Sequence, residues 1–288
     1  MTTKLQIGLI TGIAALLFVG LRSMPDTECT FLHYQSPSVS VDGIEFCGDD
    51  NPTFIDLDRL SFPVKMDMSF EEPVISGQEA FFALTLETSE GKILHPYELA
   101  ITHTKRLHVL VVDESLDDYH HVHPEPLGPS GQWGFSFTPQ KAGRYRVFAE
   151  FVPSRTQQKV IGDFEFRVIP AEDGVISRSG GSEPVAIELD MESTPAQLST
   201  AVENSFAIKF GQAVELEPVM GALGHMVAFD EALSGFAHLH PKYTGAEKAE
   251  QPELSFAFNT AKAGKYRLWA QVKISGEERF FPFDIVVQ

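Results

Sequence analysis

Cysteine and basic side chains are the scarce components of this sequence. Its two cysteines, Cys29 and Cys47, both lie near the N-terminus, and neither of the two internal repeats contains one. Any ligand-binding site in the repeats therefore has to be formed by His, Met, carboxylate or backbone groups. The chain has 22 Lys and Arg against 40 Asp and Glu, a formal net charge of −18. Because phosphate binding depends on clustered Lys and Arg, this balance argues against a nucleic-acid partner.

One long hydrophobic run is present, Leu5 to Leu21, between Lys4 and Arg22. A membrane span needs about 20 apolar residues and tolerates roughly 17. The exit from the run, Val19 to Ser23, is a poor signal-peptidase site. We therefore predict that residues 1–23 form a signal anchor, a single transmembrane helix in the inner membrane, with the bulk of the chain on the periplasmic side. Whether this segment is cut away stays open.

Residues 24–60 form a cysteine-containing segment. Export would place Cys29 and Cys47 in an oxidising compartment, where a disulfide is the default. Such a bond would stabilise the fold by about 3 kcal/mol on the chain-entropy model. Alternatively, Cys29, His33 and Cys47 form a metal site, although their spacing is not that of a familiar zinc motif.

The remaining chain is an internal duplication. A length of 288 residues suits about two domains, and 43% apolar residues with 23 Phe predict a β-rich core. Short strand-like segments punctuated by Gly and Pro fill residues 61–170, and a polar linker, 171–183, follows. Residues 184–288 repeat the plan. We predict an all-β fold of two tandem immunoglobulin-like sandwiches.

A second repeated pattern is Ala-Gly-x-Tyr-Arg, which includes Tyr145 in the first repeat and Tyr266 in the second. It predicts a tyrosine corner, in which the Tyr hydroxyl bonds back to the backbone where a strand enters the second sheet. The position two residues on, a cysteine in immunoglobulin domains, is Val147 or Leu268. The cores are therefore expected to depend on packing and not on a cross-sheet disulfide.

Six of the ten histidines occupy matched positions in the repeats. LHVLVVDESLDDYHHVHP, Leu107 to Pro124, corresponds without a gap to GHMVAFDEALSGFAHLHP, Gly224 to Pro241. Each segment predicts a half-buried strand, an acidic turn and a returning strand, with its three histidines on one face. Cross-strand neighbours are about 4.5–5.5 Å apart at Cβ, within the reach of one metal ion. The predicted ligands are His108, His121, His123, His225, His238 and His240.

Methionines add a softer donor near the second set, where Met220 and Met226 lie. The first repeat has His103 in place of Met220, which predicts a harder first site and a softer second one that favours Cu(I). Met66, Met68 and Met191 share the pattern of core residues. His95, His103 and His120 lack counterparts and are expected on the surface.

The histidine segment followed by FTPQKAGRYRVFAEF resembles bacterial exported β-sandwich domains of the YtkA-like type, which often occur beside metal-efflux or copper-handling components. The likeness covers each repeat. The tandem is also similar to cupredoxins, which are Greek-key sandwiches with histidine ligands. Neither repeat supplies the thiolate of a blue-copper centre, which argues against electron transfer through one.

These patterns favour a membrane-anchored, exported protein that binds copper, or less favourably zinc, for sequestration or for delivery to an efflux or assembly partner. We expect no enzymatic activity, because the sequence shows no nucleophile elbow, phosphate loop or isolated acid pair. The alternative is a non-catalytic structural or interaction subunit of a larger membrane complex, in which the histidines brace loops that touch the partner. Extracellular adhesion modules also stay open.

Overall fold

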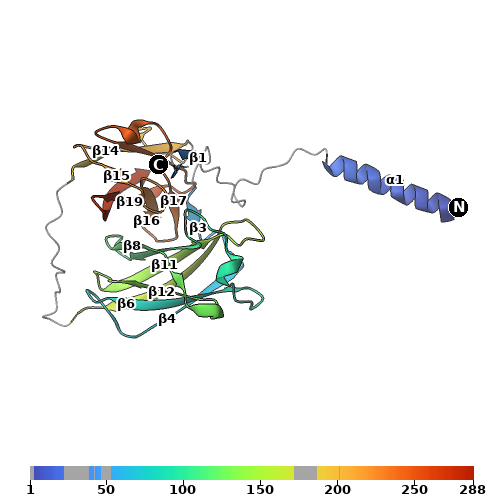
Figure 1. Cartoon of the computed structure of the whole chain (residues 1–288), viewed down its shortest axis with the longest axis horizontal. Helices are drawn as coiled ribbons and strands as arrows, with labels where there is room; N and C mark the ends of the chain where they lie inside the picture. Colours follow the sequence, from blue (N-terminus) through green and yellow to red (C-terminus); the bar gives the residue numbers. More distant parts are fainter. Residues whose placement is uncertain (1–2, 23–38, 42, 47–52, 172–186, 201) are drawn as a thin grey trace. The chain divides into compact units, whose positions relative to one another are not determined.

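The computed structural model describes residues 3–22, 39–41, 43–46, 53–171, 187–200 and 202–288. The chain divides into two compact units, Met1–His33 and Tyr34–Gln288. The first contains helix α1, Thr3–Arg22, over the uncharged run (Figure 1). Among the described residues no helix is long and apolar enough to cross a membrane, so the predicted helix forms but its assignment as a transmembrane segment is not supported. The predicted disulfide (Cys29, Cys47), the alternative site with His33, and nearly all of the predicted linker lie outside the described residues.

The first sandwich has one sheet of strand order β4-β6-β10-β9 and a facing sheet of order β5-β12-β11-β7-β8. Neighbouring strands are antiparallel, except that β5 runs parallel to β12. The strands span β4 Val64–Phe70, β5 Val74–Ile75, β6 Ala80–Thr88, β7 Leu107–Asp113, β8 Tyr119–Val122, β9 Glu125–Pro126, β10 Gln132–Phe137, β11 Gly143–Phe151 and β12 Val160–Ile169, with short 3-10 turns at η1 Pro96–Glu98 and η2 Gly128–Ser130.

The second sandwich repeats this plan with sheets β13-β14-β18 and β15-β19-β16-β17-β3, and β20 pairs with β19. Its strands span β13 Leu189–Thr194, β14 Asn204–Phe210, β15 Leu216–Glu217, β16 His225–Asp230, β17 Gly235–Leu239, β18 Glu253–Phe258, β19 Gly264–Ile274 and β20 Glu277–Val287, with a 3-10 turn at η3 Ala246–Lys248. The prediction of a predominantly β chain with two tandem domains is confirmed.

Strand β3, Ile55–Asp56, comes from the segment before the first sandwich but pairs with β17 of the second. Phe54 is 6% exposed, packs in the core of the second sandwich and makes an edge-to-face contact with Tyr266 at 5.3 Å. Gly235 permits this pairing, because a Cβ there would lie 1.7 Å from the carbonyl oxygen of Ile55. The chain thus contributes to the second sandwich before it builds the first. A separate hairpin, β1 Val39–Val41 with β2 Ile44–Phe46, packs against the same core.

Each sandwich closes on its own apolar core and carries the predicted tyrosine corner. The Tyr145 hydroxyl donates to the Lys141 carbonyl at 3.1 Å, and that of Tyr266 donates to the Lys262 carbonyl at 2.6 Å. Met66 is 4% exposed in the first core. Burial of the aromatic and aliphatic side chains, without a cross-sheet disulfide, holds the two layers together.

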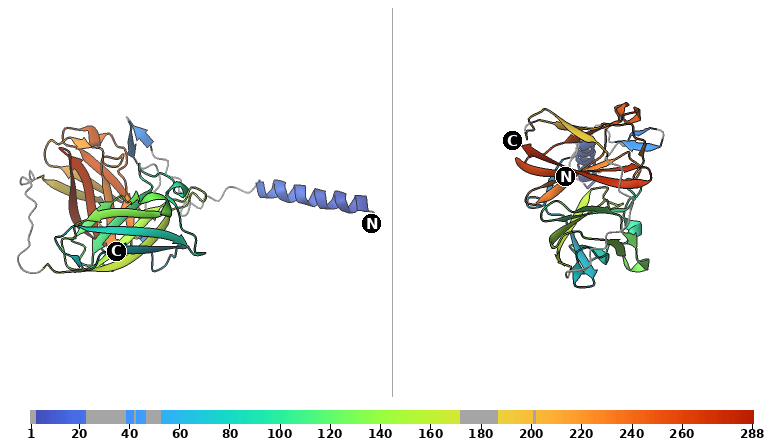
Figure 2. Two further views of the ribbon diagram at one scale, coloured as in Figure 1. Left: turned by 60° about the horizontal axis from the view of Figure 1, so that its bottom comes forward. Right: turned by 90° about the vertical axis from the view of Figure 1, so that its left-hand side faces the viewer.

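A third apolar cluster joins the two sandwiches. It contains Leu110, Val112, Leu116, Tyr119, Phe148 and Ile161 of the first and Val227, Phe229, Leu233, Phe236 and Trp269 of the second. Every residue of β7 and of β16 is therefore buried, whereas a half-buried strand was predicted. One face of each strand lines its own core, and the other packs on the neighbouring domain. Both views in Figure 2 show the sandwiches side by side.

Candidate metal centre

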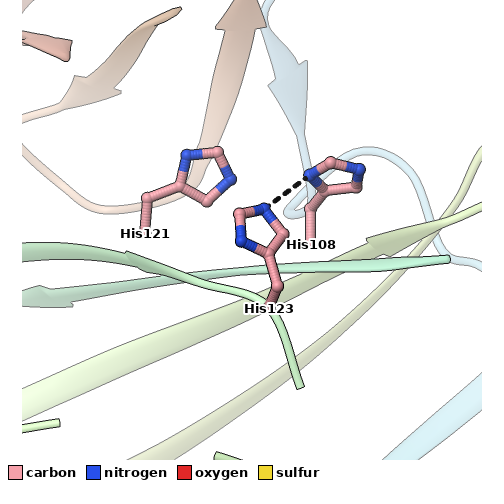
Figure 3. A group of neighbouring side chains, drawn as sticks. All are labelled: His108, His121 and His123. Atoms are coloured by element: carbon pink, nitrogen blue, oxygen red, sulfur yellow. Dashed lines mark hydrogen bonds between the residues drawn. The ribbon is translucent and has the colours of Figure 1, made fainter. Parts of the chain in front are cut away.

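The first histidine hairpin has the register that the sequence predicts. Val109 pairs with Val122 and Leu110 with His121, while the amide of Asp113 donates to the Asp118 carbonyl at 3.1 Å. This register places His108 opposite His123, whose Nε2 lies 3.2 Å from Nδ1 of His108 (Figure 3). The ligand atoms of His108, His121 and His123 all lie within 4.8 Å of one another. We call these three residues triad 1.

The second hairpin reproduces the arrangement. In β16 and β17, Val227 pairs with His238, so His225 lies opposite His240. The ligand atoms of His225, His238 and His240 also lie within 4.8 Å of one another. We call these residues triad 2. All six predicted imidazole ligands are therefore brought together as two threesomes, each on the outer face of its sheet.

Both triads are buried, because that outer face is the interface between the sandwiches. His108 and His225 are 0% and 1% exposed, and His123 is half-buried. Burial lowers the pKa of His108 to about 3 and that of His123 to about 4, with positive neighbours adding to the effect. It also holds the pKa values of three more members well below the usual range: His121, His225 and His240. These five imidazoles are therefore neutral at physiological pH, the form that binds metals.

Two of the rings have their tautomer set by an outer hydrogen bond. Nε2 of His108 donates to the Thr102 carbonyl at 2.9 Å, which leaves Nδ1 as its lone-pair nitrogen. Nδ1 of His121 donates to Oε1 of Gln271 at 3.0 Å, which leaves Nε2. The Gln271 amide is itself oriented, because its Nε2 donates to Glu278 at 2.7 Å. Metal-binding histidines characteristically make such outer bonds, which fix the ring and raise its basicity.

Several of the remaining ring nitrogens are buried without a hydrogen-bond partner in the part of the chain that the structure describes. These are Nε2 of His121 and of His240 and both nitrogens of His225 and of His238. Buried polar groups are normally hydrogen-bonded, and leaving one unbonded costs about 1–3 kcal/mol. Because the six nitrogens converge from neighbouring rings, they are candidate donor atoms for a metal ion.

Glu150 and Gln271 occupy equivalent positions in the two repeats. Glu150 pairs with His108 across β11 and β7, and Gln271 pairs with His225 across β19 and β16. Each side chain reaches the other domain's triad: Gln271 bonds to His121, and Oε1 of Glu150 lies 3.8 Å from Nδ1 of His238. Lys159, 3.2 Å from Glu150, and the neighbouring histidines keep the pKa of this buried carboxyl below its usual value despite desolvation. Sequence reasoning missed both residues, although the aligned segments FAEF and WAQV contain them.

His103, which was predicted to lie on the surface, is half-buried and packs against triad 2. Its ring centroid is 3.8 Å from that of His240. It occupies a turn with φ 48°, and Met220 has φ 52° in the equivalent turn of the second repeat. Met226, expected to soften the second site, is instead 0% exposed in the core of the second sandwich. It alternates with the histidine positions along β16 and therefore points to the opposite face.

The other two histidines without counterparts lie outside the triads. Nε2 of His120 is 2.9 Å from Asp118, so this half-buried residue braces its own turn. His95 stacks on Tyr97 with ring centroids 5.4 Å apart.

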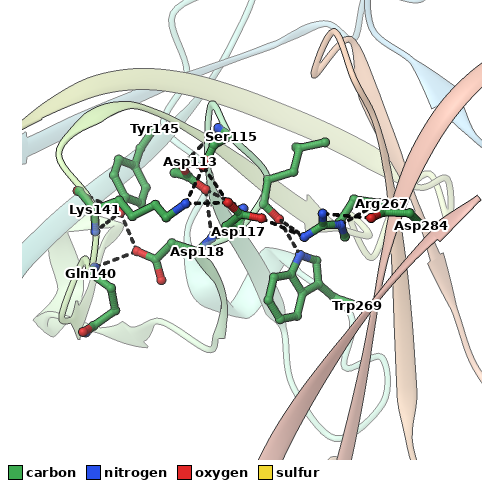
Figure 4. A network of polar contacts seen from close by, with 11 residues as sticks. Asp113, Ser115, Asp117, Asp118, Gln140, Lys141, Tyr145, Arg267, Trp269 and Asp284 are labelled. Atoms are coloured by element: carbon green, nitrogen blue, oxygen red, sulfur yellow. Dashed lines mark hydrogen bonds and ion pairs between the residues drawn. The ribbon is translucent and has the colours of Figure 1, made fainter. Parts of the chain in front are cut away.

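The acidic turn of the first histidine hairpin, residues 113–118, is held by a network of polar contacts from both sandwiches (Figure 4). The Asp113 carboxylate accepts from the amides of Asp117 and Asp118 at 2.9 and 2.8 Å. Across the interface, Arg267 forms an ion pair with Asp117 at 2.9 Å, and Nε1 of Trp269 donates to the Leu116 carbonyl at 3.1 Å.

The reverse contact is also present: Arg146 of the first sandwich donates to the Leu233 carbonyl of the second at 2.5 Å. Each repeat thus donates a side-chain hydrogen bond to the equivalent leucine carbonyl in the turn of the other repeat.

The fold and the six converging imidazoles define a tandem β-sandwich protein with a histidine cluster. A family model described as "Domain of unknown function (DUF8832)" matches residues 63–168 and again 182–288. The chain belongs to this family, with two tandem copies of its domain. The resemblance to YtkA-like domains and cupredoxins is not shown by these matches and stays a prediction.

Solved structures give weak likenesses. Salmonella alpha-2-macroglobulin matches with 14% identity and a TM-score of 0.28 over 89% of this chain and 16% of that one. Fibronectin(III)-like modules of Clostridium thermocellum CbhA match with 9% identity and a TM-score of 0.21, covering 77% of this chain and 93% of that one. Red sea bream transglutaminase matches with 11% identity and a TM-score of 0.25, covering 80% and 32%. The chain thus spans only a small part of the first of these proteins. A search of curated proteins gave no match.

Proposed function

We propose that this protein binds transition-metal ions, copper foremost, at the two histidine triads. The observation that supports this is the convergence of six imidazoles in two threesomes, four of which (His121, His225, His238 and His240) have buried ring nitrogens without a hydrogen-bond partner among the described residues. Metal coordination would satisfy these nitrogens, and imidazole suits Cu, Zn and Ni. The outer bonds of His108 and His121 present one lone-pair nitrogen from each ring to such an ion.

The chemistry of the site favours holding an ion over turning over a substrate. Closed sites with every ligand supplied by the protein are typical of structural or storage metals, whereas catalytic ones keep an open position. Five of the six imidazoles are at most 8% exposed, and only His123 reaches partial exposure. We therefore propose sequestration or delivery, with His123 on the side from which an ion enters. Export from the cytoplasm and a membrane-bound efflux or assembly partner are part of the same proposal.

The interaction-subunit alternative required the hairpin turns to contact a partner protein. Leu116 and Leu233, in these turns, are 8% and 3% exposed because each packs on the neighbouring sandwich. The apolar side chain of each turn is thus buried within the chain, which favours the metal proposal.

Calorimetric titration of the purified full-length chain tests the proposal. Cu(II), Cu(I) under anaerobic conditions and Zn(II) would each be added to the chelator-treated protein and to the His121→Ala/His123→Ala variant. We expect the variant to lose binding at triad 1, and with it one of the two equivalents, because triad 1 loses two of its three ligands while triad 2 stays whole. His95→Ala, outside the triads, is the matched control. Absence of binding above background, or equal binding by the triad variant, would refute the proposal.

The full chain is required because β3 and Phe54 belong to the second sandwich. A fragment that begins at residue 61, the start predicted for the first repeat, would remove an edge strand and a core side chain. Loss of binding in that fragment would then report misfolding and not ligand chemistry.

A further inference from the structure

The two triads adjoin in space, although they lie in different domains. Within triad 1 the ring centroids are 4.8 to 5.8 Å apart. Between triads, His121 and His238 are 5.1 Å apart, and the pairs His121–His225 and His108–His238 are each 5.8 Å apart. Spacing alone therefore does not divide the six rings into two sets. The ring-centroid distances between the triads thus overlap those within triad 1.

Each domain also supplies a polar group to the other's triad. Gln271 of the second sandwich orients His121, and Glu150 of the first lies beside His238. His103 of the first sandwich packs on His240 of the second. Neither triad is thus complete within its own domain.

We infer that the six imidazoles form one two-ion centre shared by both domains, in which an ion on one triad weakens binding of the second ion. This inference rests on the proposed function and specifies how its two sites communicate. The physical cause is repulsion between ions held in adjoining triads inside a buried interface, where the effective dielectric constant is well below that of water.

The charge of the centre determines which ions fill it. Among the described residues, Glu150 lies beside His238 and Glu125 acts on His123, and both carboxylates are partly compensated by lysines, Lys159 and Lys105. Coulomb repulsion scales with the product of the charges, so two divalent ions repel each other about four times as strongly as two monovalent ones. Full occupancy therefore favours Cu(I) over Zn(II) or Cu(II).

The test compares the full-length protein with two variants, each of which keeps one triad whole. These variants are His108→Gln/His123→Gln and His225→Gln/His240→Gln, where glutamine retains polarity and similar bulk. In Zn(II) calorimetry each variant should bind one equivalent. The unmodified protein should bind two, the second at least ~10-fold more weakly than either variant binds its single ion. In anaerobic Cu(I) competition titrations that gap should shrink. The His95→Gln control should match the unmodified protein.

An unmodified-protein isotherm equal to the sum of the two variant isotherms would overturn the shared centre, as would a total of one equivalent. Both results leave the proposed function standing, whereas no binding by any sample refutes it as well. A readout independent of the variants is the Cu(II) electron paramagnetic resonance spectrum of the unmodified protein with two equivalents. Ions in adjoining triads give dipolar broadening, and an unbroadened spectrum would contradict the inference.

Discussion

Acidification of the metal-free protein should destabilise it well above the pH at which carboxylates titrate. Five triad histidines have a folded-state pKa far below 6.5 because of burial, with His108 at about 3 and His123 at about 4. Below pH 6.5 the unfolded chain binds protons that the folded chain does not, so stability falls as pH falls. One pH unit below 6.5, each such histidine costs on the order of 1 kcal/mol, and the five together cost several kcal/mol relative to pH 8. Domain stabilities are roughly 5–15 kcal/mol, so this loss is large.

Two buried carboxylates, Asp118 and Glu150, do not change protonation between pH 8 and pH 5.5, so they do not offset this loss of stability. The lowered pKa values of Asp118 and Glu150 stabilise the fold above about pH 4.5, and that stabilisation is lost only at lower pH.

The assay is urea unfolding in the presence of chelator at pH 8, 6.5 and 5.5, followed by tryptophan fluorescence. Trp133 reports the first core and Trp269 the interface between the sandwiches. A His108→Gln/His225→Gln variant should lose about two fifths of the pH dependence, since two of five protons no longer differ between the states. His95→Gln should keep all of it. Equal stability at pH 8 and 5.5, or an unchanged slope in the double variant, would show that the triads are not buried as neutral rings.

Two further substitutions test the architecture around the site. Gly235→Ala should destabilise the protein by about 2 kcal/mol or more, because the new methyl group would collide with the Ile55 carbonyl and displace β3. Thermal unfolding measures this loss of stability. The control is Gly211→Ala, which should have little effect because its methyl group would meet the exposed Glu188 side chain. Trp269→Phe should cost about 1 kcal/mol by removing the hydrogen bond to the Leu116 turn. Unchanged unfolding midpoints would contradict both expectations.

The local architecture could be predicted from the sequence because it depends on short-range patterns. Strands β4 and β11 lie within residues 61–170, where the Gly and Pro punctuation predicts short strands. The hairpin register follows from the turn that folds Asp113 back on Asp118, and this register alone sets His108 opposite His123. Duplication then transfers the same geometry to the second repeat.

What only the tertiary structure decided is the relation between the repeats. The sequence of β7 predicts a strand with one solvent-exposed face. The strand is instead buried on both faces, because a second domain covers it and no local sequence pattern indicates that contact. The contacts of His121 with Gln271 and of Glu150 with His238 join residues far apart in the chain, and their pairing depends on how two sandwiches dock. Strand β3 likewise joins the second sandwich across the whole intervening first one. Local sequence sets which face of a strand carries the imidazoles, whereas docking sets what that face meets.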